Sequence, residues 1–235
     1  MSDVVLVHGS TQSAAGFWWL IEALARRGHR ALTVQVPGAA AATSTDYAEL
    51  LAAQLPADLH RPVIAAHSAA GLLVPALAER LDAAHLVWLA AAVADYAGGR
   101  SLLAEIHADP TAIFHEEWIG VDPSSDPVLA TYFLFHDADL ATLRQALPTV
   151  ARCDLTAIYA ETPPVDPAAR PSTYLLPVSD RILTRAAMLH MARERLGVEP
   201  VEVPGGHNTH VAHPQEIAKV IDQATRQPAH ATHPS

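Results

Sequence analysis

The stretch "VIAAHSAAGLLVPALAER" (residues 63–80) passes from an apolar run into a helical pattern of small residues, with Ser68 at the junction. This pattern predicts a buried strand followed by a helix. The flanking residues Ala66 and Ala70 are small, and Gly71 follows. Small flanks permit a sharp strand-to-helix turn that raises the serine hydroxyl above the sheet and directs the next amide to the same point. Ser68 is therefore a candidate nucleophile, although a serine at this position can also simply cap the helix.

Strand-like and helical patterns alternate on both sides of this junction. The expected strands are residues 3–8, 31–37, 62–67, 84–93, 172–178 and 198–205, and the expected helices are residues 16–29, 44–55, 69–81, 181–197 and 214–225. Nearly continuous apolar strands separated by helices indicate a parallel sheet with helices on both faces. We therefore expect an α/β fold with a mostly parallel six-stranded sheet. Ligands of such folds bind beyond the carboxyl ends of the strands.

The segment 95–150 interrupts the alternation. It contains a Gly-Gly pair, three Asp-Pro pairs and the helical phrase "TYFLFHDADLATLRQALP". Long excursions of this kind are usually functional. We expect residues 95–150 to form a small helical lid inserted into a core made of residues 1–94 and 151–226, and residues 227–235 to form a flexible tail.

Two further residues complete a candidate proton relay. A serine hydroxyl needs a general base near neutral pH, and His207 follows the last expected strand in "VEVPGGHNTHVAHP". Its imidazole needs an acid that fixes the tautomer, and Asp180 follows the fifth expected strand in "YLLPVSDRI". Asp95, after the fourth strand, is the alternative acid. Taken singly, Asp180 could cap the next helix and His207 could be a loop histidine, but their order after Ser68 matches that of nucleophiles on such turns.

With these motifs the chain resembles the α/β-hydrolase family over nearly its whole length. The matching pieces are "VLVHGS", "AHSAAG", "YLLPVSDRI" and "VPGGHNTHVAHPQEIA". It is more narrowly similar to the small lidded esterases that include plant methyl-salicylate esterases and hydroxynitrile lyases. The resemblance implies an oxyanion hole formed by the backbone amides of Ser10 and Ala69. It also implies that His8 shapes a loop.

Departures from that group narrow the expected chemistry. Hydroxynitrile lyases of the group carry a lysine after the catalytic histidine, whereas this chain has Asn208 at that position. This difference argues against cyanohydrin cleavage as the activity. Related dehalogenases use an aspartate nucleophile, whereas this chain has a serine. Aromatic residues near the site favour a largely apolar substrate. The candidate substrate-pocket residues are Thr11, Trp18, Trp118, Phe133 and Phe135.

Composition excludes several other classes of protein. Half of the 235 residues are hydrophobic, so a globular fold is expected. The net charge of −10 and the absence of a basic stretch argue against a nucleic-acid partner. No apolar run is long enough to span a membrane and no signal peptide is recognised, so a cytoplasmic location is expected. Cys153 is the only cysteine, so we expect no internal disulfide. The histidine spacing does not favour a metal site.

The sequence is compatible with three functions. The first is a serine hydrolase that cleaves a carboxylic ester, thioester or lactone. The second is a lyase or cyclisation enzyme of natural-product (polyketide) biosynthesis that uses the same three residues, and the third is a ligand-binding protein. The expected partner is a small-molecule substrate, and the mechanism needs no cofactor or metal. The sequence does not determine the oligomeric state.

Overall fold

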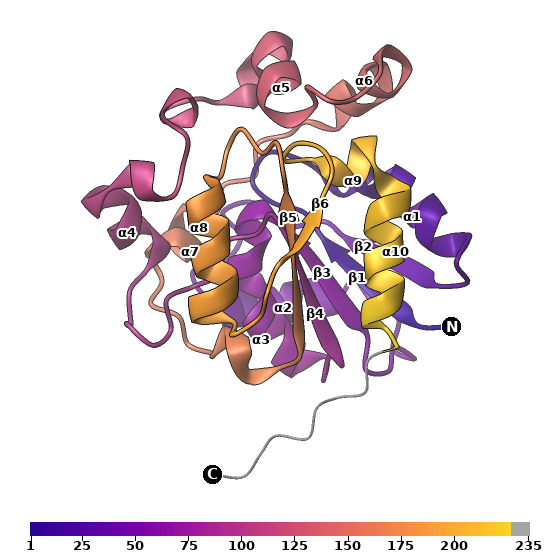
Figure 1. Cartoon of the computed structure of the whole chain (residues 1–235). Helices are drawn as coiled ribbons and strands as arrows, with labels where there is room; N and C mark the ends of the chain where they lie inside the picture. The colour runs from indigo at the N-terminus through magenta and orange to yellow at the C-terminus, as the bar shows by residue number, and fades with distance from the viewer. Residues whose placement is uncertain (227–235) are drawn as a thin grey trace.

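The computed structural model describes residues 1–226; residues 227–235, the expected flexible tail, lie outside the described residues. Its centre is a parallel sheet of six strands in the order β2-β1-β3-β4-β5-β6 (Figure 1), as predicted. The strands are β1 (Asp3–Val7), β2 (Arg30–Val34), β3 (Val63–His67), β4 (His85–Leu89), β5 (Ser172–Pro177) and β6 (Val201–Val203). The strand order reverses direction between β1 and β3, which is where such sheets form a binding crevice.

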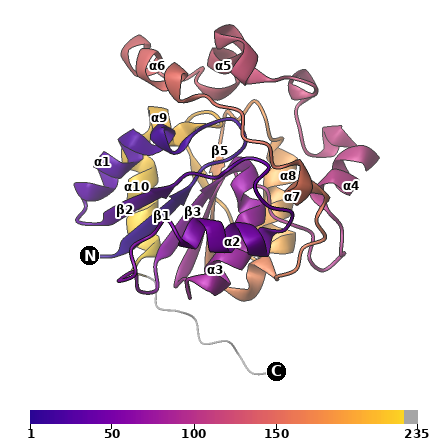
Figure 2. The same cartoon turned by 180° about the vertical axis from the view of Figure 1, so that it is seen from behind.

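Alternation along the strands divides the core between two faces of the sheet. In β1, Val5 and Val7 belong to one apolar cluster, and Val4 and Leu6 belong to the other, because successive strand residues point to opposite faces. Figures 1 and 2 show the covering helices from the two sides. The first cluster lies under α2 (Ser44–Ala52), α3 (Val74–Arg80) and α8 (Arg185–His190), and the second lies under α1 (Trp18–Ala25) and α10 (Pro214–Ala224).

Local hydrogen bonds explain where the helices begin. The Thr43 side chain accepts the Asp46 amide and caps α2 at the expected position. The helix expected from residue 181 instead begins at Arg185, because Thr184 is its N-cap. The residues between belong to a turn closed by the Asp180 carboxylate. The helix expected over residues 69–81 starts as a 3₁₀ turn, Ser68–Leu73, before α3.

The excursion between β4 and β5 is helical. It contains α4 (Leu102–Ala108), α5 (Pro127–Leu134) and α6 (Leu140–Ala146), and α7 (Thr156–Ala160) follows before β5. Figure 1 shows α5 and α6 above the sheet. Residues 95–150 form an insertion between β4 and the segment that leads to β5. Its residues face the ends of β1 and β3 across a cavity, so its position suits a cover over that end of the sheet.

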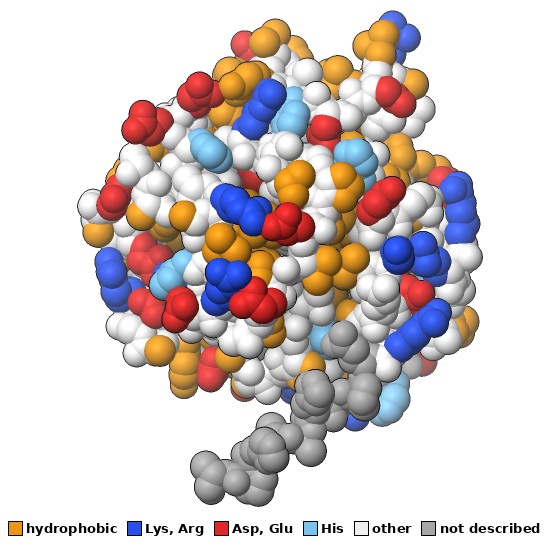
Figure 3. Space-filling model, in the orientation of Figure 1, with side chains coloured by type: hydrophobic (Ala, Val, Ile, Leu, Met, Phe, Trp, Pro, Cys, Tyr) orange, Lys and Arg blue, Asp and Glu red, His pale blue; other side chains and the backbone are white. Residues whose placement is uncertain are grey.

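The distribution of surface charge and the length of the helices can be compared with the partners expected from the sequence. Figure 3 shows acidic and basic side chains interspersed on the face that it displays. Among the described residues, no helix combines the length and apolar character needed to cross a membrane.

Candidate active site

Ser68 occupies a strained turn between β3 and the following 3₁₀ helix. Its φ angle is +57°, a left-handed conformation that costs a non-glycine residue about 1–2 kcal/mol. The turn forms because β3 ends at His67 and the next residues begin a helix at once. Strain of this kind persists where the surrounding structure holds it and is typical of functional positions.

Close packing around the turn requires glycine at two positions. A Cβ atom added to Gly71 would lie 1.9 Å from the carbonyl oxygen of Ala92. The Ala92 amide also donates a hydrogen bond of 3.0 Å to the Ser68 carbonyl. On the other side, a Cβ atom on Gly9 would lie 2.8 Å from the Ser68 Cβ. The loop after β1 therefore lies directly against the candidate nucleophile.

His207 and Asp180 form a buried pair at the ends of neighbouring strands. Nδ1 of His207 donates a hydrogen bond of 2.8 Å to Oδ2 of Asp180, and both side chains are almost fully buried. The second carboxylate oxygen of Asp180 accepts the amides of Ile182 and Leu183 at 2.7 and 3.0 Å. These bonds fix the carboxylate in one orientation. A carboxylate fixed in this way selects the imidazole tautomer with its proton on Nδ1.

Asp95, the alternative acid, makes a different contact. Its carboxylate accepts the Gly98 amide at 2.9 Å in an exposed turn. The structure thus places Asp180, rather than Asp95, against the candidate base.

The other nitrogen of the imidazole is available for chemistry. Nε2 of His207 is buried and has no hydrogen-bond partner among the described residues. With the proton on Nδ1, Nε2 carries the lone pair and can accept a proton. No hydrogen bond joins Ser68 to His207 in the described part of the chain, which is common for catalytic pairs before a substrate binds.

A second histidine connects His207 to the turn that carries Ser68. His67 directly precedes Ser68, and its Nε2–H donates to the His207 carbonyl at 3.0 Å. The two rings lie 4.7 Å apart between centroids. The His67 pKa is held well below its usual range, first by burial and then by the neighbouring His207. A neutral His67 therefore holds the backbone of the candidate base in place.

The loop that carries Ser10 runs close to the backbone amide of Ala69. A Cβ atom on Gly9 would lie 3.2 Å from the Ala69 nitrogen, so residues 9 and 10 run beside the start of the helix. The returning chain holds this loop, because the Cys153 amide donates to the Ser10 carbonyl at 2.7 Å. Nε2 of His8 accepts the Val36 amide at 2.9 Å, so His8 connects the end of β1 to the segment after β2.

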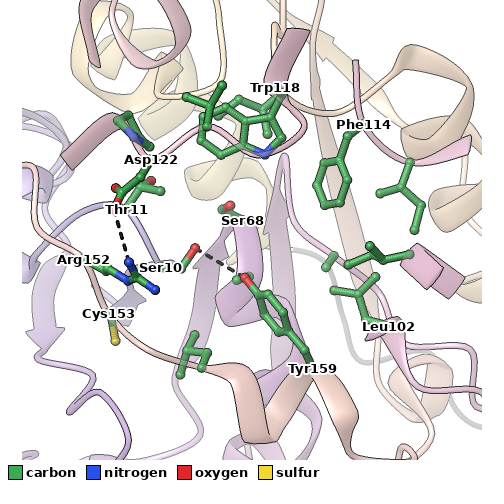
Figure 4. Close-up of a pocket in the computed structure, with 18 of the residues that line it drawn as sticks. Ser10, Thr11, Ser68, Leu102, Phe114, Trp118, Asp122, Arg152, Cys153 and Tyr159 are labelled. Atoms are coloured by element: carbon green, nitrogen blue, oxygen red, sulfur yellow. Dashed lines mark hydrogen bonds and ion pairs between the residues drawn. The ribbon is translucent and has the colours of Figure 1, made fainter. Parts of the chain in front are cut away.

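A cavity of about 470 Å³ opens over Ser68. Figure 4 shows Ser10, Ser68 and Tyr159 at its polar part, with Trp118, Phe114 and Leu102 around it. Further apolar side chains complete the wall; they are Ile106, Ile113, Val121, Leu155, Ile182 and Leu183. The size and lining suit a small, mainly apolar ligand.

Two of the expected pocket residues, Thr11 and Trp118, line this cavity. Three do not, and that expectation was wrong for them. Trp18 lies on α1 with 57% of its surface exposed, away from the cavity. Phe133, in the last turn of α5, and Phe135, just after it, are buried in the apolar core. The Phe133 ring packs edge-on against Trp118, at 5.2 Å between ring centroids.

Several lining residues escaped the sequence analysis. Tyr159 on α7 reaches the loop after β1, where its hydroxyl lies 3.4 Å from Ser10 Oγ. Arg152 and Asp122 form an ion pair of 3.3 Å at the exposed rim. Cys153 also lines the cavity, and burial raises the pKa of its thiol. Asp122 lies within the insertion, and the only sequence signal for Arg152, Cys153 and Tyr159 was their position just after it.

Comparisons with known proteins agree with the observed fold. The model of the alpha/beta hydrolase family matches residues 4–220. In sequence alone, no curated protein matches the chain significantly.

Solved structures with a similar fold include several hydrolases. A pyrethroid hydrolase from Sphingobium faniae JZ-2 superposes with a TM-score of 0.76 at 18% identity, covering 96% of this chain and 98% of that one. Polyneuridine aldehyde esterase gives a TM-score of 0.76 at 17% identity, covering 96% and 99%. Tomato methylketone synthase I gives 0.73 at 15% identity, covering 96% and 97%. At these identities the similarity establishes a shared fold.

Proposed function

The chain belongs to the alpha/beta hydrolase family, and on that premise we propose that it is a serine hydrolase. Its substrate is a carboxylic ester, thioester or lactone of a small, largely apolar molecule. The observation that carries this proposal is the placement of three groups at one end of the sheet. Ser68 stands on a turn with φ of +57°, and the preceding residue, His67, is hydrogen-bonded to the carbonyl of His207. His207 forms a buried pair with Asp180, and its Nε2 is unpaired among the described residues.

In the proposed reaction, His207 Nε2 accepts the proton of Ser68 as Oγ attacks the carbonyl carbon. Asp180 stabilises the imidazolium that forms. The amides of Ser10 and Ala69 donate to the oxyanion, and such a donor contributes about 10²–10³-fold in turnover. His207 then protonates the leaving group, and a water molecule activated by the same imidazole releases the acyl group from Ser68. No metal or organic cofactor takes part in these steps.

The insertion acts as the lid of this site. It supplies Phe114 and Trp118 to the cavity wall, so it excludes water from much of the region above Ser68. A drier site strengthens the hydrogen bonds to the oxyanion. The apolar wall selects the substrate by burying its hydrocarbon part, and a small-molecule substrate is therefore the expected partner.

The test is hydrolysis of short p-nitrophenyl esters by the purified protein and by Ser68→Ala. The wild-type protein should hydrolyse these esters, and the variant should lose the activity while keeping its melting temperature. Full activity in Ser68→Ala would refute the assignment of Ser68 as the nucleophile. Tight ligand binding without turnover by the wild type would instead favour a binding protein.

A second candidate function is elimination or cyclisation, and one observation favours it. Nε2 of His207 is not hydrogen-bonded to Ser68, so the imidazole is free to take a proton from a substrate carbon. Reactions in ¹⁸O-labelled water separate the two candidates. Hydrolysis incorporates the label into the acid product, whereas direct elimination does not.

A further inference from the structure

The feature that points beyond the proposed function is the hydroxyl of Tyr159. It lies 3.4 Å from Ser10 Oγ although the two residues are 149 positions apart in the chain. Figure 4 shows both side chains converging in the cavity next to Ser68. Ser10 is also the residue whose amide is proposed to bind the oxyanion, so this contact joins α7 to the reacting centre.

The surrounding backbone holds the two side chains in place. In α7, the Tyr159 amide donates to the Leu155 carbonyl at 3.0 Å, and Leu155 is buried in the core. Two residues before Leu155, the Cys153 amide donates a hydrogen bond to the Ser10 carbonyl. The segment that carries the tyrosine and the loop that carries the serine are therefore attached to each other independently of the hydroxyl contact.

In this contact the phenol of Tyr159 is the donor and Ser10 Oγ is the acceptor. Burial raises the pKa of Tyr159 above its ordinary value, so the hydroxyl keeps its proton near neutral pH. A serine hydroxyl has a single proton to donate, and no acceptor for that of Ser10 is found among the described residues. With its oxygen accepting from Tyr159, Ser10 is left to direct its own proton into the cavity.

We propose that the Ser10 hydroxyl is a third donor to the oxyanion, and that Tyr159 is the positioning residue that orients it. This inference rests on the proposed hydrolase function. Tyr159 O–H donates to Ser10 Oγ, and Ser10 Oγ–H donates to the oxyanion beside the amides of Ser10 and Ala69. Both hydroxyls keep their protons throughout, so the chain of hydrogen bonds transfers no charge. Consecutive hydrogen bonds polarise one another, which makes the terminal donor stronger.

The proposal separates the effects of two substitutions. Ser10→Ala removes the third donor and should lower kcat about 10²-fold, because the interaction exists only in the transition state. Tyr159→Phe leaves the Ser10 hydroxyl without its orientation and should lower kcat roughly tenfold. In both variants KM for a p-nitrophenyl ester should stay within about twofold of the wild-type value.

The decisive measurement is the double variant. If Tyr159 acts through Ser10, then Tyr159→Phe has no further effect on kcat in the Ser10→Ala background. Tyr96→Phe is the matched control, since Tyr96 lies outside the cavity and its loss of a hydroxyl should leave kcat unchanged. Melting temperatures of all variants exclude a folding defect.

Three outcomes would overturn the proposal. One is that Tyr159→Phe lowers kcat by the same factor in the wild-type protein and in the Ser10→Ala background. Another is a rise in KM alone, which would show that Tyr159 contacts the substrate directly. The third is an unchanged kcat in Ser10→Ala. Failure of the hydrolase proposal itself has a different signature, because Ser68→Ala would then remain active.

Discussion

Nδ1 of His207 and Oδ2 of Asp180 are joined by a hydrogen bond of 2.8 Å inside the protein, and the other oxygen of that carboxylate is held by two backbone amides. The acid is therefore fixed before any substrate arrives. Its orientation decides which nitrogen of the imidazole carries the proton, and so which one can act as a base.

Asp180→Asn should remove this control of the tautomer with little change in shape. The amide nitrogen of the asparagine would face His207 and favour the tautomer with its proton on Nε2, which cannot accept a proton from Ser68. We expect kcat for ester hydrolysis to fall about 10⁴-fold. The measurement is steady-state kinetics together with a melting curve. A variant that keeps more than a tenth of the wild-type kcat would contradict the assigned role.

The left-handed backbone conformation of Ser68 should lower the stability of the folded protein. At φ of +57° a glycine is unstrained, whereas alanine keeps the steric cost. We expect Ser68→Gly to be more stable than Ser68→Ala by about 1 kcal/mol, although both are inactive. Urea denaturation monitored by tryptophan fluorescence gives the two free energies of unfolding. Equal stabilities would show that the turn is not strained.

The insertion should hold the loop of the candidate base in place through Asp137. Its Oδ2 accepts the Gly206 amide at 3.0 Å and lies 3.2 Å from His213 Nε2. Asp137→Ala should lower kcat and speed hydrogen exchange of the amides around His207, because the loop loses its anchor.

Asp139→Ala is the control for this prediction. The Asp139 carboxylate accepts the Thr142 amide within the insertion, so its loss should leave hydrogen exchange around His207 unchanged. Equal exchange in the wild type and Asp137→Ala would argue against the coupling.

His85 offers a pH test remote from the site. Burial lowers its pKa to about 4, whereas a histidine in an unfolded chain titrates near about 6.5. Between these values the unfolded chain binds more protons, so the free energy of unfolding falls as the pH falls. The contribution of His85 is fully present above about pH 6.5 and is lost toward about pH 4.

His85→Gln should therefore flatten the decline in stability between about pH 6.5 and about pH 4, by up to about 1.4 kcal/mol per pH unit. Glutamine can keep a hydrogen bond to Thr173, which His85 contacts at 2.9 Å. His60→Gln, at an exposed position, is the control. An unchanged slope in His85→Gln would mean that the imidazole is protonated in the folded protein.

The sheet was predictable because its signal is local. Each strand is a short apolar run, and the positions of Ser68, Asp180 and His207 after three of those runs follow from the sequence alone. Helix starts were less predictable, since the start of α8 at Arg185 depends on the carboxylate of Asp180 closing a turn.

The lining of the cavity was the least predictable part. Periodicity identifies the apolar residues of the insertion but not which of them face the cavity, so Phe133 and Phe135 were misplaced. Trp18 was misplaced because the face of α1 that carries it is open to solvent. Tyr159 depends on a contact across 149 positions, for which no local pattern exists.

The most direct test of the central claim is labelling with a serine-directed phosphonate followed by peptide mass spectrometry. The wild-type protein should carry a single adduct, on the peptide that contains Ser68, and His207→Gln should be labelled far more slowly because its nucleophile lacks a base. An adduct on another residue, or labelling of His207→Gln at the wild-type rate, would contradict the account.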